Sequence, residues 1–395
     1  MTTRFLPTVF ELSSARFQSG SFAEILASTP RYLGCDAMVP IKGSRHTTPS
    51  TNDAHMLFRG NDGEVRAFLN ACAHRNAQLV PVGMKVKGNI TARGGMLARN
   101  GNIICPWHRY TYDQGGELVS APAYGDGAKP CAQLNEVPLE QFGGLIFEAG
   151  KGATEMLEDV MHTPSFAKLG IVPFDTRKTV LYRIDESQET FSALHAMEIF
   201  GDTDHVDDIH PNSFDQLVDM ETLWLEMGHH WSIQFVGWRE TTSKVCDEYK
   251  SYRDLVRARG NIPRYGAVWM MFGPNTTFEW YPTDVPEEHI FVVSTFVPTK
   301  DGCRNVVEWY VPEGVLARSP DLAPALMAAY AVTAEEDRAP CNSIERGRRA
   351  LVENGFGHQT LGPIHPDQEG CVAHYYDMLK MYLDRLEMRR SISYA

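Results

Sequence analysis

The chain lacks any run of apolar residues long enough to cross a bilayer, since no stretch of about 18 such residues occurs in it. Its N-terminus also lacks the charged-then-apolar pattern of a secretory signal, so we expect a cytoplasmic protein without a membrane anchor. Cysteine is scarce, with 8 residues among 395. Apart from Cys72 and Cys105 these cysteines are scattered, which favours free and mostly buried thiols over a disulfide framework.

Positive charge is also in short supply, because the net charge is −13. An acidic chain without a nucleic-acid-binding motif is not expected to bind nucleic acid. Residues 184–238 contain no Lys or Arg but 12 Asp or Glu, whereas residues 42–109 contain 10 Lys or Arg and 3 Asp or Glu. These segments form either two differently solvated surfaces or complementary patches that steer association between chains.

At 395 residues the chain exceeds the size at which a single core stops growing, so we expect two domains. Residues 41–150 alternate short apolar runs with Gly, Asn, Asp and Pro, which is typical of an antiparallel β domain. Residues 151–395 contain strand-like runs and helical segments, one of them at 322–353 with an interruption at Pro340. We therefore predict an α+β fold with a central antiparallel sheet flanked by helices. Residues 1–40 are predicted to be a lead-in that packs on this second domain.

Two short clusters each offer one thiolate and one imidazole, from Cys72 and His74 and from Cys105 and His108. A [2Fe–2S] centre with two Cys on one iron and two His on the other needs this ligand set. Neutral imidazoles in place of two thiolates raise the cluster potential to roughly −150 to +300 mV. A structural zinc site is the alternative. Its usual sequence pattern keeps the two Cys together and the two His together, whereas each cluster of this chain mixes the two types.

A second set of metal-binding residue types follows at Asp202, His205 and His210. Two His with a carboxylate form the ligand set of a non-haem Fe(II) oxygenase. On a regular helix, positions five apart point about 140° apart, so His205 and His210 can share a metal only if the helix distorts between them. Pro211 disfavours helical conformation at His210 and frees that side chain to turn inward. Asp202 is expected to contact a metal-bound imidazole.

These residues and their surroundings resemble the Rieske non-haem iron oxygenases, and in particular the terminal oxygenase (alpha) component of aromatic-ring-hydroxylating systems. The resemblance covers essentially the whole chain. Its motifs are Phe68-Leu69-Asn70-Ala71 and Arg75 around the first Cys–His pair, Tyr112-Asp113 and Gly115 after the second Cys–His pair, and the iron motif from Glu198 to His210. Two departures leave every ligand in place. Residues 83–102 form an extra segment, interpreted as an inserted hairpin, and Arg109-Tyr110 replaces the usual Gly-Trp.

The resemblance also implies where the carboxylate ligand lies. Glu336-Asp337, followed by Glu345-Arg346, resembles the family's Glu-Asp…Glu-Arg segment on the C-terminal helix and points to Asp337. Glu335 and Glu336 are the alternatives within this acidic run, which taken alone is typical of a solvated helix face. The implied ligands are Cys72, His74, Cys105 and His108 for the [2Fe–2S] Rieske cluster, and His205, His210 and Asp337 for a mononuclear Fe(II).

The resemblance implies a multicomponent enzyme in which electrons from NAD(P)H arrive through a reductase, in some members by way of a ferredoxin. They enter at the cluster and pass to the mononuclear iron, where O₂ is activated to hydroxylate a small-molecule substrate. It also implies a homotrimer, with or without a beta subunit, in which transfer runs between neighbouring subunits. Asp202 would connect His205 of its own subunit to a cluster His of the neighbour. The basic and acidic segments fit such a closed head-to-tail ring.

The sequence does not determine the substrate. An aromatic compound, as in aromatic hydrocarbon catabolism, is expected because Asp202 matches the ring-hydroxylating members. A monooxygenase or demethylase for a quaternary ammonium or N- or O-methyl compound is the alternative, since acidic and aromatic residues suit a cation. A zinc-stabilised binding module and a pure electron carrier are the other functional classes. The pocket candidates, for which ordinary core packing is an equal explanation, are Phe200, Val206, Ile209, Met227, Phe235, Trp269 and Phe291.

Overall fold

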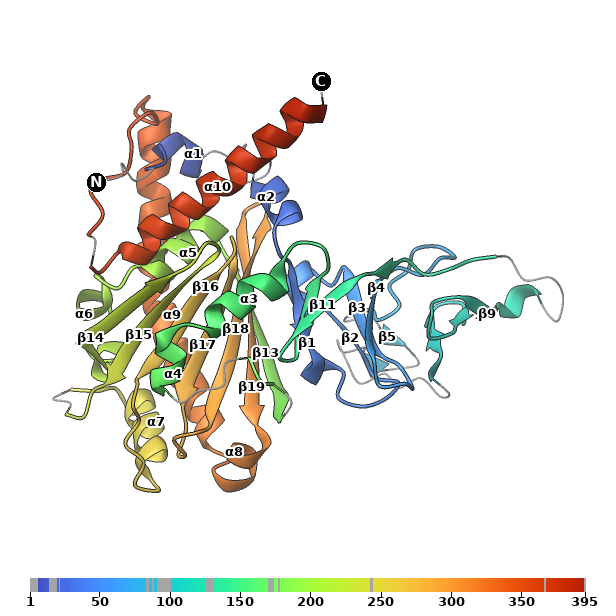
Figure 1. The fold of residues 1–395 in the computed structure, drawn as a ribbon, viewed down its shortest axis with the longest axis horizontal. Coiled ribbons are helices and arrows are strands. Elements are labelled where there is room, and N and C mark those ends of the chain that lie inside the picture. The colour runs from blue at the N-terminus through green and yellow to red at the C-terminus, as the bar shows by residue number, and fades with distance from the viewer. Residues whose placement is uncertain are drawn as a thin grey trace. The chain divides into compact units, whose positions relative to one another are not determined.

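The chain folds into two compact units (Figure 1). The N-terminal unit comprises Pro30–Thr154 and Phe174–Arg177, and the C-terminal unit comprises Met1–Thr29, Glu155–Pro173 and Lys178–Ala395. The computed structural model describes residues 6–13, 20, 22–82, 85–86, 89–90, 101–124, 131–169, 174–176, 178–241, 244–365 and 367–393.

Short antiparallel strands build the N-terminal unit, as the turn-rich sequence predicts. Short 3-10 helices join them, among them η2 (Asp36–Met38), η3 (Pro49–Thr51) and η5 (Pro122–Tyr124). The strand orders are β1 (Tyr32–Cys35), β12 (Leu145–Glu148), β11 (Leu139–Phe142); β10 (Glu136–Val137), β4 (Val65–Leu69), β3 (His55–Arg59), β2 (Arg45–Thr47); β7 (Ile103–Ile104), β8 (Thr111–Tyr112), β9 (Leu118–Ser120); and β5 (Lys85–Val86), β6 (Asn89–Ile90).

Strand β1 places residues 30–40 in the N-terminal unit and not in a lead-in to the other unit. Tyr32 pairs with Phe147 across β1 and β12, and both side chains are buried. Cross-strand pairs of this kind stabilise a sheet, so the chain from Pro30 onward is held by its own β partners.

The inserted segment 83–102 contains the antiparallel pair of β5 and β6, with Lys85 opposite Ile90. This pairing is the arrangement expected of a hairpin. Residues 91–100 of the segment lie outside the described residues.

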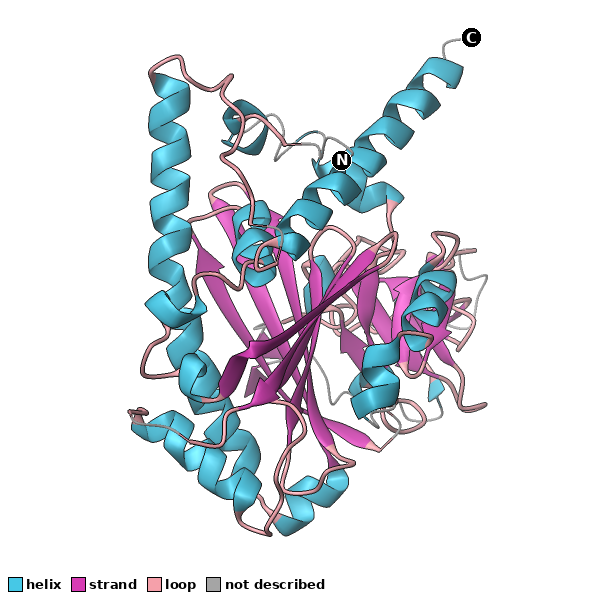
Figure 2. Cartoon of the chain, turned by 60° about the vertical axis from the view of Figure 1, so that its left-hand side comes forward, coloured by secondary structure: helices cyan, strands magenta, loops and turns pink. Residues whose placement is uncertain are grey.

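A seven-stranded antiparallel sheet forms the centre of the C-terminal unit and is drawn in magenta in Figure 2. Long strands rich in β-branched and aromatic residues account for it. The strand order is β13 (Thr179–Glu189), β19 (Gly302–Pro312), β18 (His289–Thr299), β17 (Thr276–Pro282), β16 (Ala267–Phe272), β15 (Trp231–Trp238) and β14 (Val218–Met227).

Helices cover both faces of this sheet. One face carries Val236, Val292 and Trp309, which pack with helices α7, α8 and α9 in one core cluster. On the opposite face, Phe166 of α4 packs edge-on against Trp280, with ring centroids 5.1 Å apart. The helices are α1 (Val9–Ser13), α2 (Phe22–Ser28), α3 (Ala153–Met161), α4 (Pro164–Leu169), α5 (Ala193–Gly201), α6 (Val206–Ile209), α7 (Asp247–Arg257), α8 (Glu313–Arg318), α9 (Leu322–Glu353) and α10 (Gly370–Ser393), with the 3-10 helix η6 (Phe214–Gln216).

Helix α9 runs through Pro340 without the predicted interruption. Proline removes one backbone donor and strains the preceding turn. The packing of the helix along the sheet and α7 compensates, since Leu322, Leu326 and Ala329 are buried in the same core cluster. Residues 6–13 and 22–29 pack on the other helices of this unit, where Leu12 and Phe22 join Leu194 in a second core cluster.

A buried ion pair ties α5, α9 and α10 together. Both guanidinium nitrogens of Arg348 donate to the Glu198 carboxylate, at 2.5 and 2.6 Å, and the Tyr376 hydroxyl donates to the same group. Fully buried His195 lies 3.0 Å from Glu345 through Nδ1. These contacts fix α5, and with it the start of the segment that carries His205 and His210.

Arg348→Ala is expected to lower the free energy of unfolding by about 3–5 kcal/mol, because it leaves the Glu198 carboxylate buried without its partner. Chemical denaturation measures this change. Arg349→Ala is the matched control. Arg349 is 62% exposed and its nearest approach to Glu345 is a long 3.4 Å, so we expect the free energy of unfolding to change by no more than about 0.5 kcal/mol. An equal loss of stability in both variants would show that the buried Arg348–Glu198 pair stabilises the fold no more than the exposed pair does.

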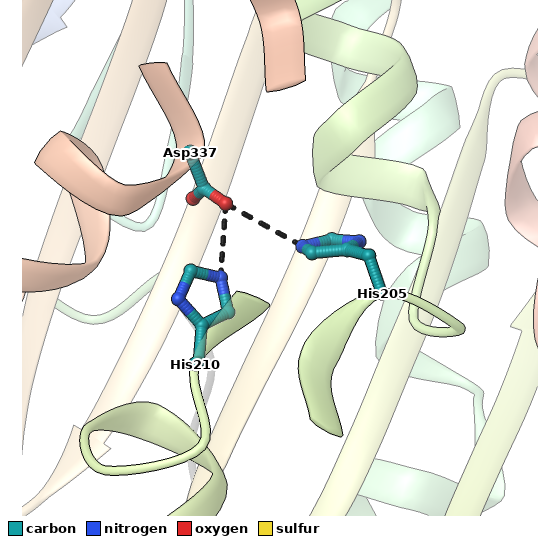
Figure 3. Close-up of side chains that lie close together, drawn as sticks. All are labelled: His205, His210 and Asp337. Carbon is teal, nitrogen blue, oxygen red and sulfur yellow. Dashed lines mark ion pairs between the residues drawn. The ribbon is translucent and has the colours of Figure 1, made fainter. Parts of the chain in front are cut away.

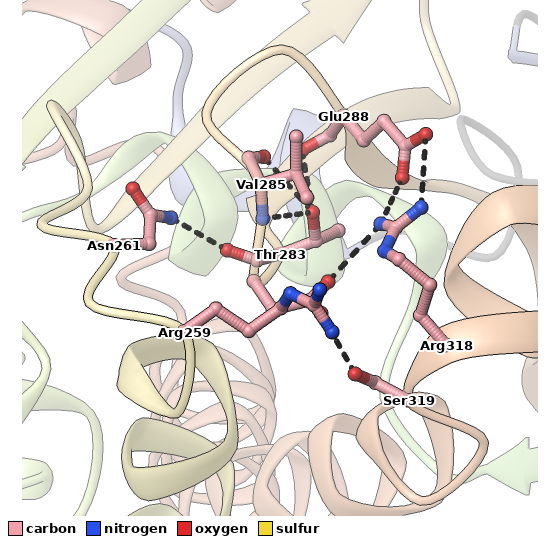
Figure 4. A network of polar contacts seen from close by, with 8 residues as sticks. Arg259, Asn261, Thr283, Val285, Glu288, Arg318 and Ser319 are labelled. Carbon is pink, nitrogen blue, oxygen red and sulfur yellow. Dashed lines mark hydrogen bonds and ion pairs between the residues drawn. The ribbon is translucent and has the colours of Figure 1, made fainter.

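A second polar network closes the end of the sheet at the β17–β18 loop (Figure 4). Arg318 of α8 binds Asp284 at 3.2 Å and Glu288 at 2.5 Å, and Ser319 donates to Asp284. The Asn261 side-chain amide donates to the Thr283 carbonyl. The network therefore joins three loops that are distant in sequence.

Among the described residues, we find no helix with the length and apolarity that crossing a bilayer requires.

Candidate metal centres

The side chains of His205, His210 and Asp337 meet in the C-terminal unit (Figure 3). Asp337 Oδ1 lies 2.9 Å from Nε2 of His210 and 3.4 Å from Nε2 of His205. One ligand atom of each residue lies within 4.8 Å of the others. Two imidazoles and one carboxylate that converge in this way, with other directions left open, fit a mononuclear non-haem iron.

A break between two helices makes this convergence possible. Helix α5 ends at Gly201, and Asp202 takes an extended conformation with φ −91° and ψ 122°. The short helix α6 begins after His205 and ends before His210, which has φ −114° and ψ 36°. The residues between the two histidines are helical, so the departure that their spacing requires falls at His210 itself. Asp337 comes from the middle of α9, far along the sequence.

Neighbouring carboxylates orient both imidazoles. Nδ1 of His210 lies 2.7 Å from Oε2 of Glu336, and the Ser213 hydroxyl donates to the same oxygen at 2.5 Å. Nδ1 of His205 lies 3.4 Å from Oδ2 of Asp202. Such contacts hold the outer nitrogen and leave each Nε2 directed inward. Glu336 therefore contacts a histidine from behind, and the Glu335 carboxylate pairs with Arg338.

The three converging groups stabilise positive charge. Burial raises the pKa of Asp337, but hydrogen bonds and charge from His205 and His210 outweigh burial and lower it. Burial lowers the pKa of His205, yet contacts with Asp202 and Asp337 raise it to about 9. The pKa of His210 is raised in the same way, against burial, by Asp337 and Glu336. A metal cation would take the place of the shared protons.

The N-terminal unit brings together the four residues expected to hold an iron–sulfur cluster. Cys72 follows β4, and Cys105 lies in the turn between β7 and β8. Both thiols are buried, whereas His74 and His108 are exposed, with ring centroids 4.9 Å apart. Two thiols on the inner side and two imidazoles on the outer side match a cluster with one ligand type on each iron.

Tight turns shape the two cluster loops. Asn76 N–H donates to the Cys72 carbonyl and Arg109 N–H to the Cys105 carbonyl. Both donors have positive φ, 56° at Asn76 and 64° at Arg109. Asn tolerates this conformation, but Arg adopts it at a cost that Gly would avoid. Tyr110 stacks on His74, with ring centroids 4.2 Å apart.

A cavity of about 140 Å³ borders the His205–His210–Asp337 group. Of the predicted pocket residues, Phe200, Val206 and Trp269 line it, and Ile209, Met227, Phe235 and Phe291 do not. Phe235 and Phe291 were misplaced because they alternate with Gln234 and Val292 and so point to the other face of the sheet. The sequence analysis also missed Glu189, Glu279, Tyr281 and Tyr330, which line the cavity.

Comparison with known proteins agrees with this architecture. Residues 33–138 match the family model of the Rieske [2Fe–2S] domain, and residues 195–385 match that of the ring hydroxylating alpha subunit (catalytic domain). Putrescine 2-hydroxylase of Bordetella bronchiseptica is 30% identical over 95% of this chain and 84% of its own length. The chain belongs to the Rieske oxygenase alpha-subunit family. The putrescine 2-hydroxylase of Ralstonia nicotianae is also 30% identical, over 96% of this chain and 95% of its own length.

Other Rieske oxygenases are more distant. The large oxygenase component of a naphthalene 1,2-dioxygenase system from Ralstonia sp is 36% identical, but over only 31% of this chain and 26% of its own. The crystal structure of a quaternary ammonium Rieske monooxygenase has a TM-score of 0.70 at 17% identity and covers 95% of both chains. At that identity the structural likeness concerns the fold.

Family membership defines the type of enzyme. The protein is the terminal oxygenase of a Rieske system, with a [2Fe–2S] cluster, a mononuclear non-haem iron and O₂ as co-substrate. Its electrons come from NAD(P)H through a reductase or a reductase and ferredoxin, and it hydroxylates a small molecule. The expectation of an α+β oxygenase is thereby confirmed, and the zinc-stabilised module and pure electron carrier are not supported.

Proposed function

We propose that this chain hydroxylates a small aliphatic amine, bound as its ammonium cation beside the mononuclear iron. The observation that carries this proposal is the lining of the cavity, in which Glu189 and Glu279 lie together with rings such as Trp269 and Tyr281. Carboxylates and aromatic faces attract ammonium groups. Arg338, the one Lys or Arg among the described lining residues, is already paired with Glu189 at 2.9 Å.

The relatives that match the full chain support this substrate class. Two of them are named putrescine 2-hydroxylase, and putrescine is a diamine. The naphthalene dioxygenase component matches over less than a third of the chain. The proposal therefore replaces the aromatic substrate expected from Asp202 with a cationic one, close to the ammonium alternative.

In this proposal His205, His210 and Asp337 hold the mononuclear iron, which supplies the site of O₂ activation when bound. Glu336 keeps the His210 ring in one tautomer, and Asp202 does the same for His205. The aromatic walls of the cavity exclude water and hold the substrate chain against the open side of this group. Cys72, Cys105, His74 and His108 are the proposed ligands of the [2Fe–2S] cluster.

We further propose a homotrimer in which Asp202 connects His205 to a cluster histidine of the neighbouring subunit. Asp202 suits this task because its side chain is 25% exposed and its Oδ1 already accepts from the Asp204 N–H. The excess of basic residues in 42–109 and of acidic residues in 184–238 supports docking between subunits. Light scattering tests the trimer, and a monomer that stays active at high dilution would contradict it.

Metal analysis and substrate turnover test the function. Purified protein is expected to contain about three iron atoms and two acid-labile sulfides per chain and to be brown. With a surrogate reductase and NADH, putrescine is expected to be hydroxylated and naphthalene to be left unchanged, as mass spectrometry of the products would show. Turnover of naphthalene without turnover of any aliphatic amine would overturn the proposed substrate class while leaving the family unchanged.

A further inference from the structure

Glu279 is the most deeply buried carboxylate among the described residues that line the cavity. It lies on the central strand β17, where it pairs with Trp269 of β16. Gln234 of β15 pairs with Trp269 in turn, so the three side chains form one row on the same face of the sheet. All three line the cavity. The sheet register therefore fixes an acid within a row of cavity-lining side chains.

Four hydroxyl groups hold the Glu279 carboxylate. Tyr281 donates to Oε2 at 2.7 Å, and Ser294 donates to Oε1 at 3.0 Å. Tyr330 and Thr277 also donate to Oε1, at 3.2 and 3.3 Å. These donors come from β17, β18 and α9, so the carboxylate is held from three elements. Such contacts orient an anion without neutralising its charge.

No Lys, Arg or His among the described residues forms an ion pair with Glu279, whereas Glu189 at the same cavity is paired with Arg338. A buried carboxylate without a counter-charge is costly. Burial accordingly raises the pKa of Glu279 to about 7, although the four hydroxyls act in the opposite direction. A cation that enters the cavity would supply the missing charge.

Aromatic rings complete the surroundings of this carboxylate. Tyr330 stands edge-on to Tyr281 and to Trp309, with centroids 6.2 and 5.1 Å apart. Trp269 contacts Phe214, whose ring is in turn close to His210. Ring faces next to a carboxylate favour an ammonium group over a neutral or anionic one.

Helix α9 carries one residue that contacts this carboxylate and one that belongs to the metal-binding group. Tyr330, which donates to Glu279, and Asp337 lie seven residues apart on the same helix, which corresponds to about 10 Å along its axis. A substrate that reached from one to the other would need a chain of several carbon atoms. We therefore expect an ammonium group at Glu279 to be separated from the oxidised carbon by part of the substrate chain.

We propose that Glu279 is the specificity-determining residue that binds a terminal ammonium group of the substrate, so that a carbon further along the alkyl chain is presented to the metal site. This inference rests on the proposed function. It selects amines in which the charged nitrogen and the oxidised carbon are separated by an alkyl chain. A diamine meets this requirement.

Glu279→Gln tests this assignment, because it keeps the shape and removes the charge. Putrescine binding to the oxidised holoenzyme is measured by anaerobic isothermal titration calorimetry. We expect Kd to rise by roughly 30- to 100-fold, as loss of a charged hydrogen-bonded partner would cause. Glu308→Gln is the matched control. Glu308 is also a buried glutamate that accepts from a tyrosine, Tyr310, but it lies on β19 outside the cavity lining, so its Kd should match the wild type.

Two further measurements separate the ways in which the inference can fail. Glu279→Asp keeps the charge and is expected to recover part of the affinity, and wild-type enzyme should bind putrescine at least 10-fold more tightly than the neutral diol of equal length. Unchanged Kd in Glu279→Gln, with putrescine still hydroxylated by the wild type, would overturn the role of Glu279 alone. A wild type that neither prefers nor hydroxylates the amine would overturn the proposed function as well.

Discussion

His210→Ala is expected to abolish hydroxylation and to reduce the iron content from about three atoms per chain to about two. The reason is geometric, because Nε2 of His210 lies 2.9 Å from Asp337 Oδ1, and among the described residues His205 is the one other His that joins this group. The proposed cluster ligands belong to the other compact unit. The visible absorbance and the reduced-state EPR signal of the cluster should therefore match the wild type. Metal analysis and EPR on the same sample give both readings.

Substitutions in the acidic run decide which carboxylate is the third ligand. Asp337→Ala is expected to behave like His210→Ala. Glu336→Gln keeps a side chain of the same shape next to Nδ1 of His210 but removes its charge. It should lower activity by roughly 10- to 100-fold, with partial loss of iron. Glu335→Gln, whose carboxylate pairs with Arg338 and is 70% exposed, should retain iron and turnover. Full iron content and activity in Asp337→Ala would exclude it as a ligand and make Glu336 the next candidate.

The parts of the site that were predictable from sequence are those whose geometry is local. The two cluster loops place Cys72 near His74, and Cys105 near His108, within a few residues, so their spacing predicts a shared site. Helix geometry predicted a distortion between His205 and His210, and the structure shows it at His210, where φ is −114° and ψ is 36° after the helical residues 206–209.

The assignment of Asp337 needed more than local spacing. An isolated Glu-Glu-Asp run on a helix is typical of a solvated face, and only the family resemblance singled out one member. In the structure Glu335 pairs with Arg338, Glu336 contacts Nδ1 of His210, and Asp337 contacts Nε2 of both His210 and His205. Successive helix positions point about 100° apart, so Asp337 alone of the three reaches both histidines. Which of them faces the histidines depends on how α9 packs on the sheet.

The substrate cavity could not be predicted, because strand register decides it. A side chain one position along a strand points to the opposite face. Phe235 and Phe291 were chosen for their hydrophobicity and lie on the far face, whereas Glu279 resembles an ordinary surface acid within a strand and is fully buried. Its four hydroxyl partners come from three elements, so their positions depend on the tertiary fold.

Asp202→Asn is expected to slow reoxidation of the reduced cluster by roughly 10- to 100-fold, with both metal centres and the oligomeric size retained. The substitution nearly preserves shape. It removes the negative charge that lies 3.4 Å from His205 Nδ1, and it weakens acceptance from imidazole N–H groups. Rapid mixing of the reduced enzyme with putrescine and O₂, followed at the cluster absorbance, measures the rate directly.

Asp208→Asn is the control for this prediction, because Asp208 is an exposed acid on the neighbouring helix α6. Its cluster should reoxidise at the wild-type rate. If Asp202→Asn were equally fast, Asp202 would serve only as the end of α5, where its backbone N–H bonds to Glu198. If reoxidation of the cluster is slow in Asp202→Asn but not in Asp208→Asn, the Asp202 carboxylate lies on the electron path. The two variants then have the same iron content, oligomeric size and change in surface charge.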